Sequence, residues 1–139
     1  MAEQIKTLVR RLVEEVWNRG DYAVVDELVG DDYLGHPSEV RGTEGYKQFF
    51  MALRGAFPDI EFTIQDQIAE GDKVVVRWTA RGTHDGDYFG IPPTGRAGVI
   101  TGVEVLKFAD GKATTCWGEV DQLGLLQQLG VISLPVPAT

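Results

Sequence analysis

The side chain best suited to acid–base chemistry is that of Glu104, a carboxylate between two valines in a strand-like run. If it faces a cavity, the loss of water raises the pKa of the carboxyl and makes Glu104 a candidate general acid or base. The alternative is a glutamate on a solvated or subunit-facing side, paired with Lys107, Arg77 or Arg81. The sequence leaves both placements open.

Three further side chains carry groups that could take part in catalysis. His36 precedes Pro37 after a strand-like segment, so it could border a cavity or be an ordinary hydrogen-bonded loop histidine. Asp121 is a catalytic candidate only if its strand bulges or slips, because its position before a short helix predicts an N-cap. Cys116 has no Cys-His motif to activate it, and a lone buried cysteine usually behaves as a small hydrophobe.

Composition excludes several classes of partner and site. The formal net charge is −8 without a basic patch, whereas nucleic-acid binding needs clustered lysine and arginine. There is no apolar run of membrane-spanning length, and the single cysteine fits a reducing compartment, so we expect a cytoplasmic protein. The two histidines, the cysteine and Glu104 fall on separate predicted elements without paired spacing, so we expect no metal site. No motif predicts a cofactor.

The elements that position these groups begin with helices. An apolar stripe predicts a helix over residues 3–18 that ends at Gly20. A short helix is predicted over 22–29 with Asp21 as its N-cap, and a third over 43–55 with Thr43 as its N-cap. The stripe of the first helix comprises Ile5, Leu8, Val9, Leu12, Val16 and Trp17.

Strands follow from residue 60 onward, where the apolar period changes to two. We expect strands over 60–68, 73–81, 99–108 and 113–120, with Asp110-Gly111 as a hairpin turn and a final helix over 122–129. Alternation in the second strand predicts that Trp78 points inward and Arg77 outward. Helices first and strands afterwards predict an α+β fold, in which helices cover one face of a curved, largely antiparallel sheet.

A curved sheet closed by helices leaves a cavity, which is the usual site for a small ligand. Five side chains are predicted to contact a small hydrophobic molecule there: Trp17, Tyr33, Trp78, Cys116 and Trp117. For Trp78, filling the core is the alternative to contact with a ligand. The chain is predicted to form one domain, 1–139, in which residues 133–139 with their two prolines are a loose tail.

A glycine- and proline-rich loop, Gly82 to Gly95, connects two of the predicted strands. Together with Phe-Ala-Asp-Gly-Lys at 108–112 and Leu-Leu-Gln-Gln-Leu-Gly at 125–130, it closely resembles the SnoaL-like polyketide cyclase family of the nuclear-transport-factor-2-like superfamily. The resemblance implies a cone-shaped fold, with three N-terminal helices on the concave face of a curved antiparallel or mixed sheet and a pocket between them. That superfamily also hosts isomerases, hydrolases, hydroxylases and binding modules, so the fold alone leaves the function open.

The same resemblance carries over the cyclases' catalytic residues one at a time. An ungapped alignment places the family's acid/base aspartate on Gly118, which has no side chain, and the assisting histidine on Glu104. A glutamine of the cyclases falls on Gly102, and an asparagine falls on or beside His36. The resemblance therefore implies the cyclase framework without its catalytic aspartate.

Two functions fit these residues. The first is a cofactor-independent lyase-, isomerase- or cyclase-like enzyme on a small hydrophobic molecule, in which Glu104 moves protons while His36 and the aromatic side chains shape the site. The second is a non-catalytic ligand-binding or accessory protein on the same fold. Because related folds commonly pair through the outer face of the sheet, we also expect a homodimer or a higher homo-oligomer.

Overall fold

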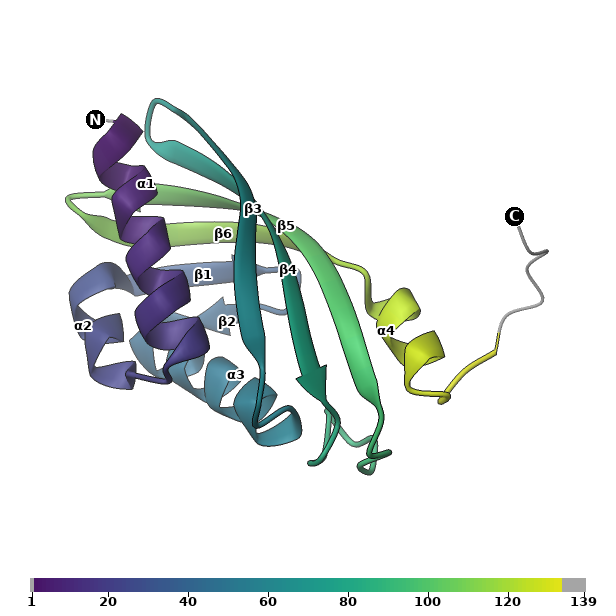
Figure 1. The fold of residues 1–139 in the computed structure, drawn as a ribbon. Helices are drawn as coiled ribbons and strands as arrows, with labels where there is room; N and C mark the ends of the chain where they lie inside the picture. Colours follow the sequence, from purple (N-terminus) through teal and green to yellow (C-terminus); the bar gives the residue numbers. More distant parts are fainter. Residues whose placement is uncertain (1, 134–139) are drawn as a thin grey trace.

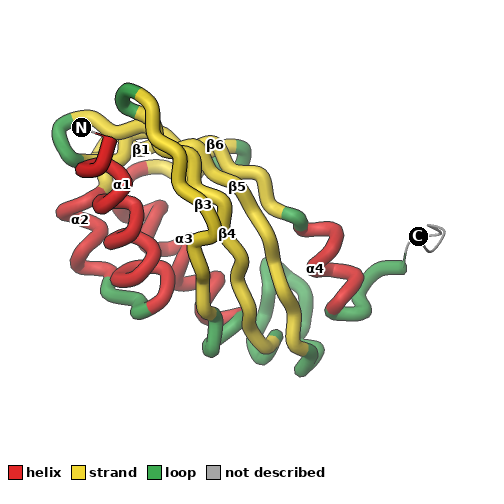
Figure 2. The backbone as a smooth tube through the Cα atoms, turned by 45° about the horizontal axis from the view of Figure 1, so that its top comes forward, coloured by secondary structure: helices red, strands yellow, loops and turns green. Residues whose placement is uncertain are grey.

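The computed structural model describes residues 2–133 (Figures 1 and 2). Its helical elements are α1 (Ala2–Arg11), the π-helix η1 (Leu12–Asn18), the 3-10 helix η2 (Tyr22–Val24), α2 (Val25–Leu28), α3 (Gly42–Ala56) and α4 (Gln122–Gln128). Its strands are β1 (Val29–His36), β2 (Val40–Arg41), β3 (Glu61–Glu70), β4 (Lys73–Thr83), β5 (Ala97–Ala109) and β6 (Lys112–Val120). Of the predicted loose tail, residues 134–139 lie outside the described part.

The strands form one curved, unclosed sheet in the order β2-β1-β6-β5-β4-β3. Neighbouring strands are antiparallel except β1 and β6, which are parallel. Figure 1 shows α1, α2 and α3 on one side of the sheet, and Figure 2 shows α4 apart from them, beyond the end of β6. This arrangement confirms the predicted α+β fold. None of the described helices is both long and apolar enough to span a membrane.

The first helical segment is continuous over residues 2–18, but its second half is wound as a π-helix. Arg11, between the two halves, keeps right-handed helical angles of φ −63° and ψ −43°. The buried side chains include Val13, which the predicted stripe omits. A π-helix has more residues per turn than an α-helix, so it turns this extra side chain inward while Trp17 still packs against the sheet residue Phe62.

Neither of the first two predicted helix caps makes a capping hydrogen bond. Asp21 makes no side-chain capping bond, and the segment after it is a 3-10 turn followed by α2, which ends at Leu28. Thr43 does not cap α3, because that helix already begins at Gly42, directly after β2. Before η2, Gly20 at φ +69° sets the direction of the chain. Before α3, the pairing of β2 with β1 sets it. This tertiary constraint outweighs the local preference for a capping side chain.

The alternation predicted for β4 is confirmed, with Trp78 buried and Arg77 exposed. The β3 strand departs from strict alternation at a bulge between Ile64 and Asp66. A bulge inserts an extra residue, so the apolar Ile68 turns outward and is 64% exposed. Before the bulge, Phe62 of β3 still points inward and lines the cavity.

The β5–β6 hairpin contains a second bulge, which sets the register of the site. Its turn is the predicted one, with Asp110 and Gly111 both at positive φ, 52° and 78°. A regular ladder from this turn would pair Glu104 with Trp117, but the register shifts by one residue near the turn and pairs Glu104 with Gly118. Opposite residues of a ladder lie on the same face, so Gly118 shares the concave face with Glu104 and Trp117 does not.

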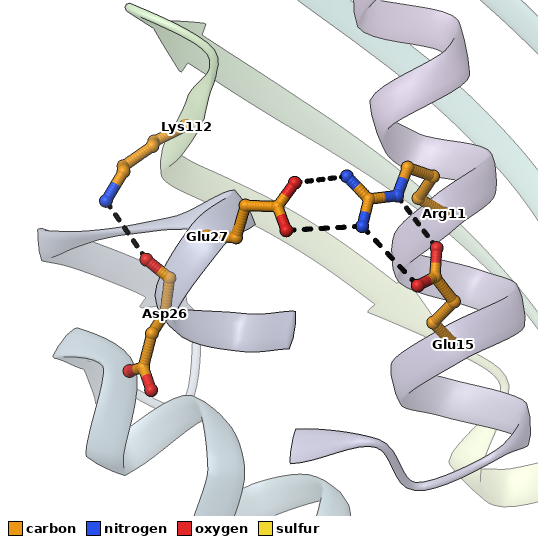
Figure 3. Close-up of polar contacts among 5 residues, drawn as sticks. All are labelled: Arg11, Glu15, Asp26, Glu27 and Lys112. Atoms are coloured by element: carbon orange, nitrogen blue, oxygen red, sulfur yellow. Dashed lines mark hydrogen bonds and ion pairs between the residues drawn. The ribbon is translucent and has the colours of Figure 1, made fainter. Parts of the chain in front are cut away.

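Polar contacts on the surface tie the helical layer to one end of the sheet (Figure 3). Arg11 donates to Glu15 at 2.8 Å and also to Glu27 of α2. Lys112, at the start of β6, donates to the main-chain carbonyl of Asp26 at 3.0 Å. Solvent screens these largely exposed charges, so the contacts place α2 more than they stabilise the fold.

The glycine- and proline-rich loop between β4 and β5 is held by its own hydrogen bonds. His84 is fully buried, and its Nδ1 accepts a hydrogen bond from the Thr94 N–H at 3.2 Å. The Tyr88 hydroxyl donates to Gln122 Oε1 at 2.6 Å, which joins the loop to α4. The loop thereby carries Tyr88 and the following Phe89 to the cavity described next.

Candidate functional site

A cavity of about 820 Å³ lies between the helical layer and the concave face of the sheet. An inner extension of about 100 Å³ continues from it toward β1. The walls of the cavity and of its extension are mostly apolar. Two carboxylates border them, Glu104 and Glu119, and none of the described lysines or arginines does. The aromatic wall comprises Trp17, Phe49, Phe50, Phe62, Trp78, Tyr88 and Phe89.

Glu104 borders both parts of the cavity from the concave face of β5. Burial raises the pKa of its carboxyl to about 7, and the nearby Cys116 thiol and Trp78 indole oppose that rise. The Cys116 thiol donates to Glu104 Oε1, with 3.6 Å between sulfur and oxygen. At neutral pH the carboxyl is therefore present in both protonation states, as a group that takes and returns a proton must be.

Gly118 leaves free the space that the Glu104 carboxylate borders. The two residues are cross-strand partners. A Cβ atom on Gly118 would lie 3.4 Å from both Cγ and Oε1 of Glu104. The Glu104 carboxylate thus lies beside the very position to which the family resemblance assigns the cyclases' aspartate.

Cys116 and Tyr33 border the inner extension next to Glu104. Burial raises the pKa of the Cys116 thiol, and the charge of Glu104 raises it further. Burial likewise raises the pKa of the Tyr33 phenol. Both groups stay protonated at neutral pH, so Cys116 acts as a hydrogen-bond donor to Glu104 and is not poised as a nucleophile.

Trp78 belongs to the core and to the cavity wall at once. Its ring lies across its cross-strand partner Gly102, where a Cβ atom would come within 2.4 Å of the ring. Trp78 is 5% exposed and packs edge-on against Phe62, with ring centroids 5.1 Å apart. Its indole N–H is buried and is near enough to the Glu104 carboxyl to oppose the rise of its pKa, but it does not meet hydrogen-bond geometry with any of residues 2–133. Gly102 is therefore required for close packing of this side chain against β5.

A buried hydrogen bond joins two aromatic side chains from different helices. The Trp17 N–H donates to the Tyr46 hydroxyl at 2.7 Å. Tyr46, on α3, is 3% exposed and lines the inner extension. It is absent from the predicted site residues, because its place on the apolar face of a helix predicts a core residue. The one signal that could have found it is a hydroxyl on that apolar face.

Of the remaining predicted residues, His36 shares the inner extension with Glu104, whereas Trp117 and Asp121 do not line the cavity. His36 borders the inner extension, but its ring stacks on Trp117 with centroids 6.0 Å apart. Trp117 is 43% exposed and lies outside the cavity, because the register of β6 turns it to the outer face. The Asp121 carboxylate accepts a hydrogen bond from the Gly124 N–H at 2.9 Å and caps α4. Within residues 2–133, no three His, Cys, Asp or Glu side chains form a group that could hold a metal ion.

Comparisons with known proteins agree on one family. A family model described as SnoaL-like polyketide cyclase matches residues 7–129. The chain is 32% identical over 136 residues to the aklanonic acid methyl ester cyclase DnrD of Streptomyces peucetius, covering 94% of this chain and 92% of that protein. The structure of TsrD from Streptomyces laurentii superimposes with a TM-score of 0.88 at 29% identity, over 95% of this chain and 98% of that one. The structure of IdmH from Streptomyces antibioticus superimposes with a TM-score of 0.79 at 32% identity, over 91% of this chain and 98% of that one.

Proposed function

This chain belongs to the SnoaL-like polyketide cyclase family, and we propose that it is a cofactor-independent, cyclase-like enzyme whose proton-transfer group is Glu104. The observation that supports this most is the position of the Glu104 carboxylate beside Gly118, at the border of a mostly apolar cavity. The family resemblance assigns the cyclases' aspartate to Gly118, and the Glu104 carboxylate borders the same space from the neighbouring strand. The acid–base group is thus supplied by β5 in place of β6.

The chemistry needs a single group that takes a proton from the carbon next to a carbonyl and later returns it. Ionised Glu104 takes that proton, and the electron pair of the C–H bond forms an enolate. The enolate carbon then attacks a second carbonyl of the same molecule and closes a ring, or it is reprotonated at another position. In either case the proton on Glu104 goes back to the product, so no cofactor is consumed.

The cavity favours a neutral, flat and largely apolar substrate. Aromatic rings form much of its wall, and the described residues place no lysine or arginine there to pair with a substrate carboxylate. A substrate anion would meet ionised Glu104 in a poorly solvated space, which is unfavourable. An ester is therefore favoured over a free acid, and the relative DnrD is named as the cyclase of a methyl ester.

Hydrogen–deuterium exchange tests this proposal without knowledge of the natural substrate. β-Tetralone, a neutral bicyclic ketone with enolisable C–H groups, is incubated with the protein in D₂O, and NMR follows exchange next to the carbonyl. The unaltered protein should accelerate exchange, and Glu104→Gln should abolish the acceleration. The double variant Glu104→Gln/Gly118→Asp returns a carboxylate to β6 and should restore part of it. Glu61→Gln, an exposed carboxylate on β3, is the matched control and should exchange like the unaltered protein.

Two outcomes would contradict the proposal. Exchange that survives Glu104→Gln would show that another group moves the proton. Binding of β-tetralone without any acceleration would favour the second function left open by the sequence, a non-catalytic ligand-binding or accessory protein. The glycine at position 118, where the family resemblance places the cyclases' aspartate, keeps this second function in view.

We also expect a homodimer that pairs through the outer face of the sheet. That face carries the exposed apolar side chains Val103 and Trp117, 40% and 43% exposed, which a second copy would cover. Light scattering that shows a monomer at micromolar concentration would contradict the dimer.

We also propose a cytoplasmic location. The single cysteine, Cys116, is a free thiol, which fits a reducing compartment.

A further inference from the structure

The orientation of the Tyr46 hydroxyl is controlled by its neighbour Trp17. An indole N–H can only donate, so the 2.7 Å contact uses the Tyr46 oxygen as the acceptor. Trp17 is itself held in place by stacking on Phe50, with centroids 5.2 Å apart, and by an edge contact with Phe62 at 5.1 Å. The hydroxyl proton of Tyr46 must therefore point away from Trp17.

Tyr46 lines the inner extension of the cavity, so that space is open to its hydroxyl proton. The Tyr46 ring packs against Tyr33 and Phe50, with centroids 5.2 Å and 4.9 Å away. Among residues 2–133 its hydroxyl finds no acceptor for its proton, although the side chain is only 3% exposed. It lines the same extension as Glu104. A buried donor without an acceptor lowers stability, so its presence beside a cavity points to a ligand oxygen there.

We infer that Tyr46 is a further catalytic residue, whose hydroxyl donates a hydrogen bond to the substrate's carbonyl oxygen while Glu104 takes a proton from the adjacent carbon. The inference rests on the proposed function and narrows the substrate to an enolisable ketone or ester whose carbonyl oxygen enters the inner extension. Trp17 is the positioning residue that orients the donor.

The electron flow of the step explains why a donor is needed at that point. As the C–H bond breaks, its electron pair becomes the carbon–carbon double bond and the carbonyl π pair moves to oxygen. Negative charge on that oxygen grows during the step, so a hydrogen bond to it is stronger in the transition state than in the ground state. Burial holds the pKa of the Tyr46 phenol well above its usual value, and the charge of Glu104 adds to the rise. Tyr46 therefore stays a neutral donor and gives up no proton.

Deuterium exchange of β-tetralone by Tyr46→Phe is the first test. We expect kcat to fall by about 100- to 1,000-fold, as for loss of one donor to a developing oxyanion, with KM changed far less. Tyr22→Phe removes a phenol outside the cavity and should exchange like the unaltered protein. A fall in kcat of less than about tenfold for Tyr46→Phe, which one ordinary neutral hydrogen bond would account for, would overturn the inference. A larger loss for Tyr33→Phe than for Tyr46→Phe would also overturn it, because Tyr33 would then be the donor.

Binding of β-naphthol separates this inference from the proposed function, since binding needs no turnover. β-Naphthol presents an oxygen acceptor on a flat ring system, and β-methylnaphthalene has a similar shape without the oxygen. By calorimetry, Tyr46→Phe should weaken β-naphthol binding about 3- to 10-fold and leave β-methylnaphthalene binding unchanged. This selective loss without any catalysed exchange would uphold Tyr46 as a donor while the proposed function fails. An equal loss for both ligands, or no loss for either, overturns the inference.

Folding is checked by the melting temperature, because Tyr46→Phe leaves the Trp17 N–H without its acceptor. If that variant does not fold, Trp17→Phe/Tyr46→Phe removes both members of the hydrogen bond and orphans no donor. The double variant should show the same fall in kcat and the same selective loss of β-naphthol binding. Trp17→Phe alone keeps the Tyr46 hydroxyl but no longer fixes its orientation. We expect a smaller fall in kcat than for Tyr46→Phe, again with weaker binding of β-naphthol and unchanged binding of β-methylnaphthalene. An unchanged ratio of the two affinities in every variant would leave Trp17 and Tyr46 with a structural role only and overturn the inference.

Discussion

Replacement of Glu104 by glutamine should stabilise the protein at alkaline pH and leave its stability at acidic pH nearly unchanged. Burial raises the pKa of this carboxyl from 4.5 to about 7. Between these values the unfolded chain has lost a proton that the folded protein keeps, so the free energy of unfolding falls as the pH rises through this range. The rise to about 7 corresponds to a destabilisation of about 3 kcal/mol, complete above the folded pKa and absent below 4.5.

Glutamine has nearly the same shape as glutamic acid and carries no charge at any pH, so the substitution removes this destabilisation. At about pH 8.5 the variant should exceed the unaltered protein by up to about 3 kcal/mol, or about 10 °C in melting temperature. At about pH 5 the two proteins should unfold within about 1 kcal/mol of each other. Urea unfolding followed by tryptophan fluorescence at both pH values measures the difference.

Glu61→Gln serves as the control, since this carboxylate is exposed on β3. It should change the free energy of unfolding by less than about 0.5 kcal/mol at either pH. The reasoning is refuted if the stability difference between Glu104→Gln and the unaltered protein does not grow between the two pH values. The Glu104 carboxyl would then be solvated, and its proposed action as a base near neutral pH would lose its physical basis.

Glycine, cap and pH effects offer independent tests. Gly102→Ala places a Cβ atom 2.4 Å from the Trp78 ring, so urea unfolding should show a loss of about 1–3 kcal/mol. Gly55→Ala, with open space around it in the last turn of α3, should instead be neutral or stabilising by up to about 1 kcal/mol, and a loss at Gly55 equal to that at Gly102 would contradict the packing argument. Asp121→Asn should keep the melting temperature while Asp121→Ala loses about 1 kcal/mol of stability; equal losses would mean that the carboxylate has another task. The rate of β-tetralone exchange should rise with pH to a plateau above about 7 as Glu104 ionises, and a flat pH profile would exclude it as the base.

The amino-acid sequence by itself determined the features that neighbouring residues control. Alternation in β4 placed Trp78 inward, Asp110-Gly111 formed the expected hairpin turn, and Asp121 capped the last helix. Each depends on side-chain period, on φ preference or on a hydrogen bond across a few residues, and adjacent residues carry all three. The loop and the closing segment were also distinctive enough to identify the family, which the match over residues 7–129 confirms.

Only the tertiary structure decided which groups meet in the cavity. A one-residue bulge pairs Glu104 with Gly118 and turns Trp117 outward, although a regular ladder from the same turn would have done the reverse. Trp17 and Tyr46 are 29 residues apart and meet only because the fold brings η1 and α3 together over the concave face of the sheet. Strand register and helix placement depend on the total apolar area that folding buries. That total is a sum of contributions from residues distant in the chain. No local pattern carries that sum, so the sequence could name Glu104 as the candidate for proton transfer but could not name the residues that surround it.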